Sequence, residues 1–217
     1  MIKENVEKIL RELPEKVKLV VATKKIGVGD IEEAIKWGVK IIGENYIKET
    51  EEKYRVIGNK VKWHLIGHLQ KNKVKRAVKL FDVIETIDSI ELAQVLDREC
   101  EKINKIMPVL LEVNVARESQ KSGVLPEKVE DLLKEILSLK NVKLMGLMTM
   151  GPLVDNPESI RPFFKRTKEI FDKIKSSYKD RLEWVYLSMG MSDTYRIAIQ
   201  EGANLIRIGT AIFGPKR

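Results

Sequence analysis

The chain has 217 residues, of which 43% are hydrophobic and 33% are charged, and its formal net charge is +8. This composition excludes a disordered or fibrous protein, and the length suffices for one domain, including a lean α/β barrel of about 200 residues. The single cysteine, Cys100, excludes an internal disulfide and fits a reducing compartment such as the cytoplasm. No apolar run approaches the roughly 20 residues of a membrane helix, and the charged segment 1–13 lacks the apolar region of a signal peptide.

The positive net charge raises the alternative of a nucleic-acid-binding protein. Lysine and arginine are interleaved with acidic residues on the predicted helix faces, and aromatic residues make up only 6% of the chain. The sequence therefore shows neither a basic stripe nor a platform for base stacking. We expect no nucleic-acid partner, although a positive excess helps to attract a small phosphorylated ligand.

Short apolar strands alternate with helical periodicity along the chain, which indicates parallel strand–helix–strand units. Strands are expected at 17–23, 40–42, 61–66, 81–87, 107–115, 142–148, 182–187 and 204–208. Helices are expected at 1–13, 30–37, 44–56, 72–80, 89–105, 127–139, 157–176 and 193–200. The regular alternation, without a linker, predicts a single (β/α)₈ TIM-barrel domain over residues 1–217. An open doubly wound sheet is the alternative, because a sequence does not show closure.

Several helix ends carry capping signals. Asp30 and Asp88 each precede a glutamate by three residues, which is the spacing of a capping box, and Asn156 stands directly before a proline. Ser192 is in the position of an N-cap for the helix expected from 193, and Gly202 is in the position of its C-terminal stop.

Small and polar residues gather where the predicted strands end. These ends read A-T-K at 22–24, G-E-N-Y at 43–46, W-H-L-I-G-H-L-Q at 63–70, M-T-M-G at 148–151, S-M-G-M-S at 188–192 and R-I-G-T at 207–210. The carboxyl ends of the strands form the active face of such barrels. We therefore expect one ligand to lie across this end of the barrel.

The last two strand ends predict an anion site. Barrels frequently bind phosphate after strands seven and eight, where backbone N–H groups at helix starts point at the ligand. Ser192, Gly209 and Thr210, with Ser188 nearby, would supply amides and hydroxyls there. The alternative is that Ser192 only caps its helix and Gly209 only turns the chain.

Lys24 and Arg207 have unusual positions for charged residues. Lys24 follows a buried strand and should reach the barrel mouth, where a desolvated amine can form a Schiff base. Lys25 should point elsewhere because strand residues alternate. Arg207 shares a strand face with Leu205 and Gly209, and if that face points inward the guanidinium needs a partner, such as a ligand carboxylate or a pyridine nitrogen. The alternative is an outward arginine that lies over a helix.

Other ligand motifs are incomplete. The G-V-G at 27–29 lacks the third glycine of a dinucleotide fingerprint, and there is no Walker A pattern. His64 and His68 fall across a strand and a turn, and no cysteine or carboxylate cluster completes a zinc set. We expect no metal.

A set of motifs extends over nearly the whole chain, from Val17 to Gly214. They are A-T-K at 22–24, G-E-N-Y from 43, W-H-L-I-G-H-L-Q-x-N-K from 63, K-S-G at 121–123, G-L-M-T-M from 146, L-S-M-G-M-S-D from 187 and R-I-G-T-A-I-F-G from 207. Together they resemble the pyridoxal phosphate homeostasis protein family (YggS/PROSC type), which is related to the barrel domain of alanine racemase. Thr23 departs mildly from the serine that is usual in the first motif.

The resemblance implies a binding site for pyridoxal 5′-phosphate (PLP) that is formed by Lys24, Asn45, Met189, Ser192, Arg207, Gly209 and Thr210. Lys24 would carry PLP as a Schiff base, and Ser192, Gly209 and Thr210 would hold its phosphate. Arg207 would lie near the pyridine nitrogen, Asn45 would line the site, and Met189 and Met191 would border the cofactor.

The expected function is that of a PLP carrier in intracellular PLP homeostasis, without strong catalysis and without a catalytic residue. An arginine opposite the pyridine nitrogen disfavours its protonation, which makes the ring a weaker electron sink. The sequence also ends three residues after Gly214, without the second domain that supplies an opposing tyrosine in the related racemases. We expect a monomer, with apo PLP-dependent enzymes or amino acids as candidate partners. An amino-acid racemase or a Schiff-base lyase on the same lysine is the enzymatic alternative.

Overall fold

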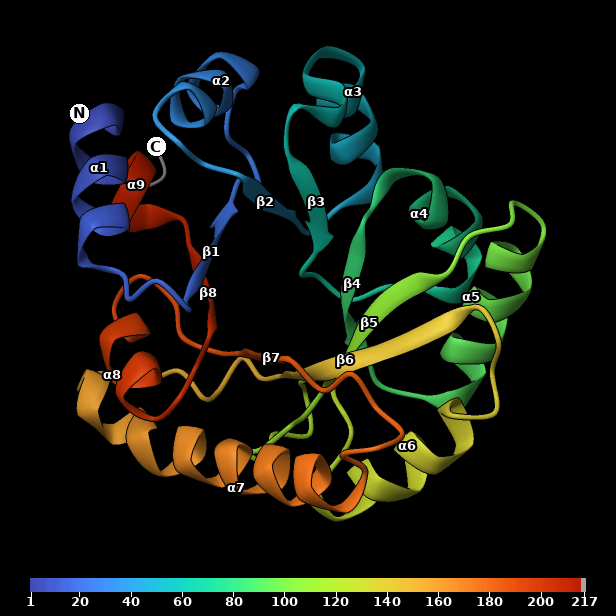
Figure 1. Ribbon diagram of the computed structural model, residues 1–217. Coiled ribbons are helices and arrows are strands. Elements are labelled where there is room, and N and C mark those ends of the chain that lie inside the picture. Colours follow the sequence, from blue (N-terminus) through green and yellow to red (C-terminus); the bar gives the residue numbers. More distant parts are fainter. Residues whose placement is uncertain (216–217) are drawn as a thin grey trace.

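Eight parallel strands close into a barrel in the computed structural model, which describes residues 1–215 (Figure 1). The strands are β1 (Lys18–Ala22), β2 (Ile41–Glu44), β3 (Lys62–Leu65), β4 (Val83–Ile87), β5 (Met107–Glu112), β6 (Val142–Met148), β7 (Tyr186–Ser188) and β8 (Leu205–Ile208). They pair in chain order, and β8 pairs with β1 to complete the ring. The predicted barrel is confirmed and the open sheet is excluded. The predicted domain boundary at Arg217 lies outside the described residues.

The helices surround the barrel on its outer side (Figure 1). They are α1 (Ile2–Glu12), α2 (Val28–Lys36), α3 (Ile47–Ile57), α4 (Val74–Leu80), α5 (Ile90–Glu101), α6 (Val129–Ile136), α7 (Arg161–Ser177), α8 (Tyr195–Gln200) and α9 (Thr210–Phe213). Short 3₁₀ turns lie at Gly58–Lys60, Lys71–Lys73, Pro126–Lys128 and Pro157–Ile160. Within residues 1–215, none of these helices has the length and apolar character needed to cross a membrane.

Some predicted boundaries are wrong for identifiable reasons. The helix expected at 89–105 ends at Glu101, and Asn104 then adopts a left-handed conformation with φ of 50°, which asparagine tolerates better than most residues. The strand expected at 182–187 begins only at Tyr186. The preceding Trp184 instead stacks on Phe171 of α7, with 5.7 Å between ring centroids. Apolar residues here pack against a helix instead of extending the strand.

Both expected capping boxes are absent. Asp30 lies inside α2, whose N-cap is Gly27. The N-cap of α5 is Ser89, one residue after Asp88, and its side chain makes no capping hydrogen bond. Both helices instead gain stability from the apolar faces that they bury against the barrel.

Around α8 one expectation is wrong and another is confirmed. The N-cap of α8 is Thr194, so Ser192 does not cap this helix and its side chain is available elsewhere. Gly202 follows the end of α8 with φ of 93°, which is the expected stop. Asn156 also caps as expected, because its side-chain oxygen accepts a hydrogen bond from the Glu158 N–H at 3.1 Å.

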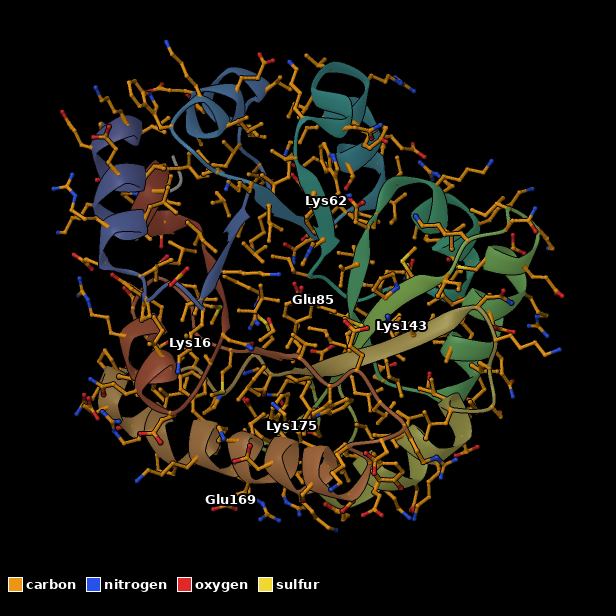
Figure 2. The ribbon with its side chains drawn as sticks, viewed as in Figure 1. Lys16, Lys62, Glu85, Lys143, Glu169 and Lys175 are labelled. Atoms are coloured by element: carbon orange, nitrogen blue, oxygen red, sulfur yellow. The ribbon has the colours of Figure 1, made fainter. Side chains whose placement is uncertain are left out.

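The apolar core has two parts. The larger part fills the layer between the strands and the helices, and the smaller part lies inside the barrel and consists of Val20, Ile66, Leu110, Met145, Met148 and Leu205. Polar side chains share the barrel interior with the smaller part, and Figure 2 shows Glu85 within the ring of strands. A charged group buried this deeply requires hydrogen-bond or ion-pair partners. The partners of Glu85 extend toward the candidate site.

Candidate functional site

A cavity of about 260 Å³ opens at the carboxyl ends of β1 and β8, beside the loop that follows β7. Its lining includes all but one of the site residues expected from the sequence, namely Lys24, Asn45, Ser192, Arg207, Gly209 and Thr210. The exception is Met189, which is fully buried in the larger apolar core. Met191, the other methionine expected at the cofactor, lines the cavity. Folding thus brings the predicted residues together from opposite ends of the sequence.

Lys24 presents its amine to this cavity. The side chain is partly buried, and among residues 1–215 the amine has neither a hydrogen-bond nor an ion-pair partner. The chain turns immediately afterwards at Lys25, which has a positive φ of 61° and an exposed side chain. The N–H of Lys25 donates to the Glu49 carboxylate. The two neighbouring lysines therefore point to different environments, as expected.

A buried lysine holds the turn that carries Lys24. Lys53, on α3, is only 5% exposed, and its Nζ donates to the Thr23 carbonyl at 2.6 Å. The same Nζ donates to Glu44 Oε1 at 2.6 Å and to Glu49 Oε1 at 2.7 Å. Thr23 Oγ1 also donates to Glu44 Oε1 at 2.6 Å. This ion-pair network joins the ends of β1 and β2 to α3 and fixes the backbone next to Lys24.

Lys53 does not fully compensate the burial of the Glu44 carboxylate in this network. Burial raises the pKa of Glu44, and the attraction and hydrogen bond of Lys53 oppose that rise without cancelling it. Glu44 Oε2 has no hydrogen-bond partner among the described residues. Sequence reasoning missed Lys53, because the spacing of Glu49 and Lys53 is that of an ordinary ion pair on a solvated helix face. Lys53 is thus the main compensation for a fully buried carboxylate.

Backbone amides gather at the ends of β7 and β8. Ser192 Oγ accepts hydrogen bonds from the N–H groups of Gly209 at 3.4 Å and Ala211 at 3.2 Å. A Cβ atom on Gly209 would lie 3.1 Å from the carbonyl oxygen of Ala22, so a glycine permits the close approach of β8 to β1. The arrangement collects N–H donors and the hydroxyls of Ser192 and Thr210 at one end of the cavity, as an anion site requires.

Arg207 begins a polar chain through the barrel interior. The residue is 3% exposed, which confirms the inward face and excludes the outward alternative. Its Nη1 donates to Ser188 Oγ at 2.6 Å and its Nη2 to the Thr149 carbonyl at 2.7 Å. Ser188 Oγ donates to Glu85 Oε2 at 2.6 Å, and His64 Nδ1 lies 2.6 Å from Glu85 Oε1. These hydrogen bonds therefore link the cavity to the centre of the barrel.

The charges in this series of hydrogen-bonded side chains stabilise one another. Burial acts to raise the pKa of Glu85, but the hydrogen bond and charge of His64, with the charge of Arg207, outweigh it and leave the pKa lowered. Burial lowers the pKa of Arg207, and Glu85 opposes this effect. Glu85 therefore remains an anion and compensates the buried guanidinium. Its position in the middle of the apolar strand V-I-E-T-I was the sequence signal that could have revealed it.

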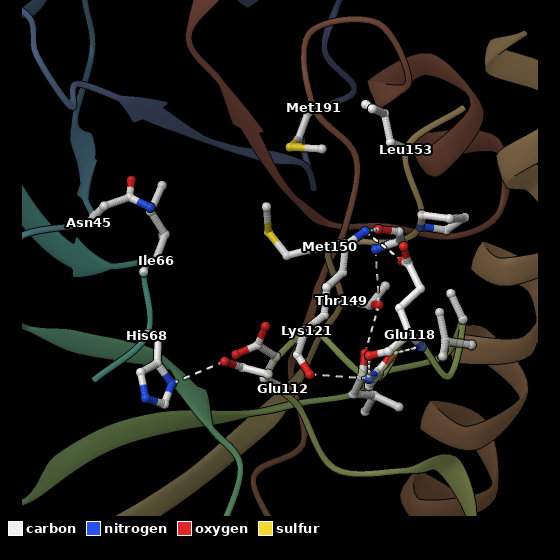
Figure 3. Close-up of a pocket in the computed structure, with 18 residues that line it drawn as sticks. Asn45, Ile66, His68, Glu112, Glu118, Lys121, Thr149, Met150, Leu153 and Met191 are labelled. Atoms are coloured by element: carbon white, nitrogen blue, oxygen red, sulfur yellow. Dashed lines mark hydrogen bonds and ion pairs between the residues drawn. The ribbon is translucent and has the colours of Figure 1, made fainter. Parts of the chain in front are cut away.

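A second cavity of about 430 Å³ lies beside the first and shares Asn45, Ile66, Met150 and Met191 with it (Figure 3). A Cβ atom on Gly67 would lie 2.7 Å from the Cα atom and the carbonyl oxygen of Asn45, so only a glycine lets the two loops approach this closely. Asn45 is thereby held between the two cavities. Within residues 1–215, no three histidine, cysteine or carboxylate side chains are arranged to hold a metal ion.

Fold and site together define a barrel of the alanine racemase N-terminal type, and the family model described as "Alanine racemase, N-terminal domain" matches residues 1–217. The chain is 40% identical over 201 residues to the pyridoxal phosphate homeostasis protein of Aquifex aeolicus, which covers 92% of this chain and 87% of the relative. It is 35% identical to that of Pasteurella multocida, over 99% of this chain and 94% of the relative. The chain belongs to the pyridoxal phosphate homeostasis protein family.

Solved structures agree with this assignment. PipY of Synechococcus elongatus with PLP bound is 30% identical, with a TM-score of 0.91, and the match covers 99% of this chain and all of that one. The same protein without PLP gives a TM-score of 0.93 at 31% identity, with the same coverage. Alanine racemase of Clostridium difficile is 16% identical with a TM-score of 0.83, and the match covers 99% of this chain and 59% of that one. The racemase shares the fold.

Proposed function

We propose that this protein binds PLP in the cavity at β1 and β8, covalently through Lys24, and serves as a PLP carrier in intracellular PLP homeostasis. The observation that carries the proposal is the meeting of an unpartnered amine, a buried guanidinium and a group of amide donors in one cavity. These groups match the aldehyde, the pyridine ring and the phosphate of PLP in chemical type. The PLP-bound PipY structure, on the same fold, supports the choice of ligand.

Different residues would bind different parts of PLP. PLP supplies an aldehyde that condenses reversibly with a primary amine, and a ring that withdraws electrons. Lys24 provides the amine, and the network around Lys53 fixes its backbone. Gly209, Thr210 and Ser192 bind the phosphate through N–H and O–H donors.

Arg207 would limit catalysis. A guanidinium donates hydrogen bonds and accepts none, so it favours an unprotonated ring nitrogen. Binding without strong catalysis follows from this preference. We further propose that the protein acts as one PLP-binding domain, as a monomer and in the cytoplasm, with apo PLP-dependent enzymes as partners.

The test is a visible absorption spectrum of the purified protein with added PLP, followed by borohydride reduction and peptide mapping. We expect a stable visible band and a reduced adduct on the peptide that carries Lys24. Lys24→Ala should abolish the band, whereas Lys25→Ala is a matched control that should retain it, because Lys25 is exposed and points away from the cavity. An adduct spread over many lysines, or an unchanged band in Lys24→Ala, would refute the proposal. Stereospecific turnover of L-amino acids that depends on Lys24 would favour an enzyme.

A further inference from the structure

The second cavity contains a carboxylate that the PLP proposal does not use. Glu112 ends β5 and lines this cavity together with Asn45 and Lys121 (Figure 3). It is only 7% exposed, and its Oε2 is buried without a hydrogen-bond partner among the described residues. A buried carboxylate that lacks a partner costs free energy, and such a group in a native fold requires an explanation.

The neighbouring cations do not compensate Glu112. Lys121, in the loop after β5, donates to the Gly151 carbonyl at 3.0 Å and pairs with Glu118 at 2.5 Å. His68, after β3, contacts Ser122 Oγ at 3.2 Å, and its Nδ1 lies 3.8 Å from Asp88. These side chains are engaged with other groups.

The remaining charges near Glu112 are Asp88, which follows β4, and Arg207 on β8. Burial, and secondly the negative charge of Asp88, raise the pKa of Glu112 to about 7, and Arg207 opposes the rise. Arg207 donates to Ser188 and Thr149 and shares its charge with Glu85. The balance around Glu112 is therefore negative, and a cation in the cavity would relieve it.

The geometry selects an organic cation. A metal ion would need a set of ligands that residues 1–215 do not provide. An ammonium group instead can be held by a carboxylate that accepts hydrogen bonds from its N–H groups. Asn45 lines the same cavity, but its Oδ1 is buried, which leaves Glu112 as the acceptor for an ammonium group. A space of about 430 Å³ suits a small molecule.

We propose that this second cavity binds the protonated amino group of a small primary amine, amino acids included, and that Glu112 accepts its hydrogen bond. The two cavities share Asn45, Ile66, Met150 and Met191, so the bound amine would lie next to the PLP cavity. The importance of a position next to the PLP cavity rests on the proposed function, whereas the binding of the amine itself does not depend on that function.

The test is isothermal titration calorimetry on the full chain without PLP, with n-propylammonium as the probe and n-propanol as its neutral counterpart, at pH 8. We expect Glu112→Gln to weaken n-propylammonium binding by about tenfold or more, because it removes the charge from a buried site. Glu118→Gln is the matched control, because it changes another carboxylate of the same cavity whose charge is compensated by an ion pair with Lys121. It should change the affinity by less than about threefold.

The pH dependence gives a second readout. The ammonium group binds the ionised carboxylate, so the affinity of the unmodified chain should rise about tenfold from pH 6 to pH 8, and that of Glu112→Gln should rise much less. Equal binding of n-propanol, an unchanged affinity in Glu112→Gln, or no saturable binding would each overturn the proposal. Lys24→Ala should bind the amine normally, so a failed PLP experiment and a failed amine experiment remain distinguishable.

Discussion

The buried Lys53 allows a quantitative prediction about stability. Lys53→Met keeps the bulk of the side chain and removes its charge, which leaves Glu44 fully buried with the Thr23 hydroxyl as its remaining donor. Removal of one partner from a buried ion pair costs about 3–5 kcal/mol, because the other charge stays uncompensated. Glu49 is partly exposed and adds little to this cost. We expect the free energy of unfolding, measured by urea denaturation at pH 8, to fall by about this amount.

The pH dependence of that loss identifies its cause. The pKa of Glu44 is already raised by burial and should rise further without Lys53. A raised pKa in the folded state destabilises the fold as the pH increases, so the cost of Lys53→Met should be greatest at pH 8 and should shrink toward pH 5. Lys53→Met combined with Glu44→Gln should recover part of the loss.

The matched control is Lys48→Met, on the exposed side of the same helix, which should change stability by less than about 0.5 kcal/mol. The reasoning is refuted if Lys53→Met costs less than about 1 kcal/mol at pH 8. A cost that is equal at pH 5 and pH 8 would also refute it, because the buried charge of Glu44 would then not be its source.

Two further predictions concern the second cavity. Glu112→Gln should stabilise the protein by about 3 kcal/mol at pH 8, because the pKa rises from 4.5 to about 7 on folding, and the gain should disappear toward pH 4. Urea denaturation at both pH values measures this, and a destabilised variant at pH 8 would contradict it. Gly67→Ala should cost about 2 kcal/mol or more and weaken the visible PLP band, because its Cβ would meet the backbone of Asn45 at 2.7 Å. Gly29→Ala, which meets nothing within 4 Å inside α2, should be neutral or stabilising, and equal losses in the two variants would exclude the steric cause.

The barrel and most of the site could be predicted from the sequence because their signals are local. Strand ends are marked by polar residues after apolar runs, as at Lys24 and Asn45, whereas Arg207 stands out as a charge inside an apolar strand. Met189, which the resemblance implied at the cofactor, does not line the cavity, because β7 ends at Ser188 and Gly190 takes a φ of 92°, so side chains no longer alternate as in a strand. Met191, which the resemblance implied with it, does line the cavity.

The pairing of the buried charges could not be predicted, although the position of Glu85 inside an apolar strand indicated that it is buried. Glu85 is hydrogen-bonded to Ser188 across 103 residues, and that contact exists only after the barrel has closed. Glu112 and Lys53 resemble ordinary surface charges until the neighbouring loops and helices cover them. Periodicity shows which face of an element is apolar, but it does not show which charged side chain the fold encloses.

The pairing of β1 with β8 closes the ring, and the candidate site lies at the carboxyl ends of these two strands. Val20 and Val21 of β1 lie opposite Arg207 and Ile208 of β8, and Lys24 and Gly209 follow just beyond these pairs. A ligand bonded to Lys24 and held by the amide of Gly209 would link the end of the first strand to the end of the last. Its departure would remove that link, so the β1–β8 pair should be more mobile in the empty protein than in the loaded one. Partners could then distinguish the loaded from the empty protein by the mobility of one strand pair, without touching the ligand.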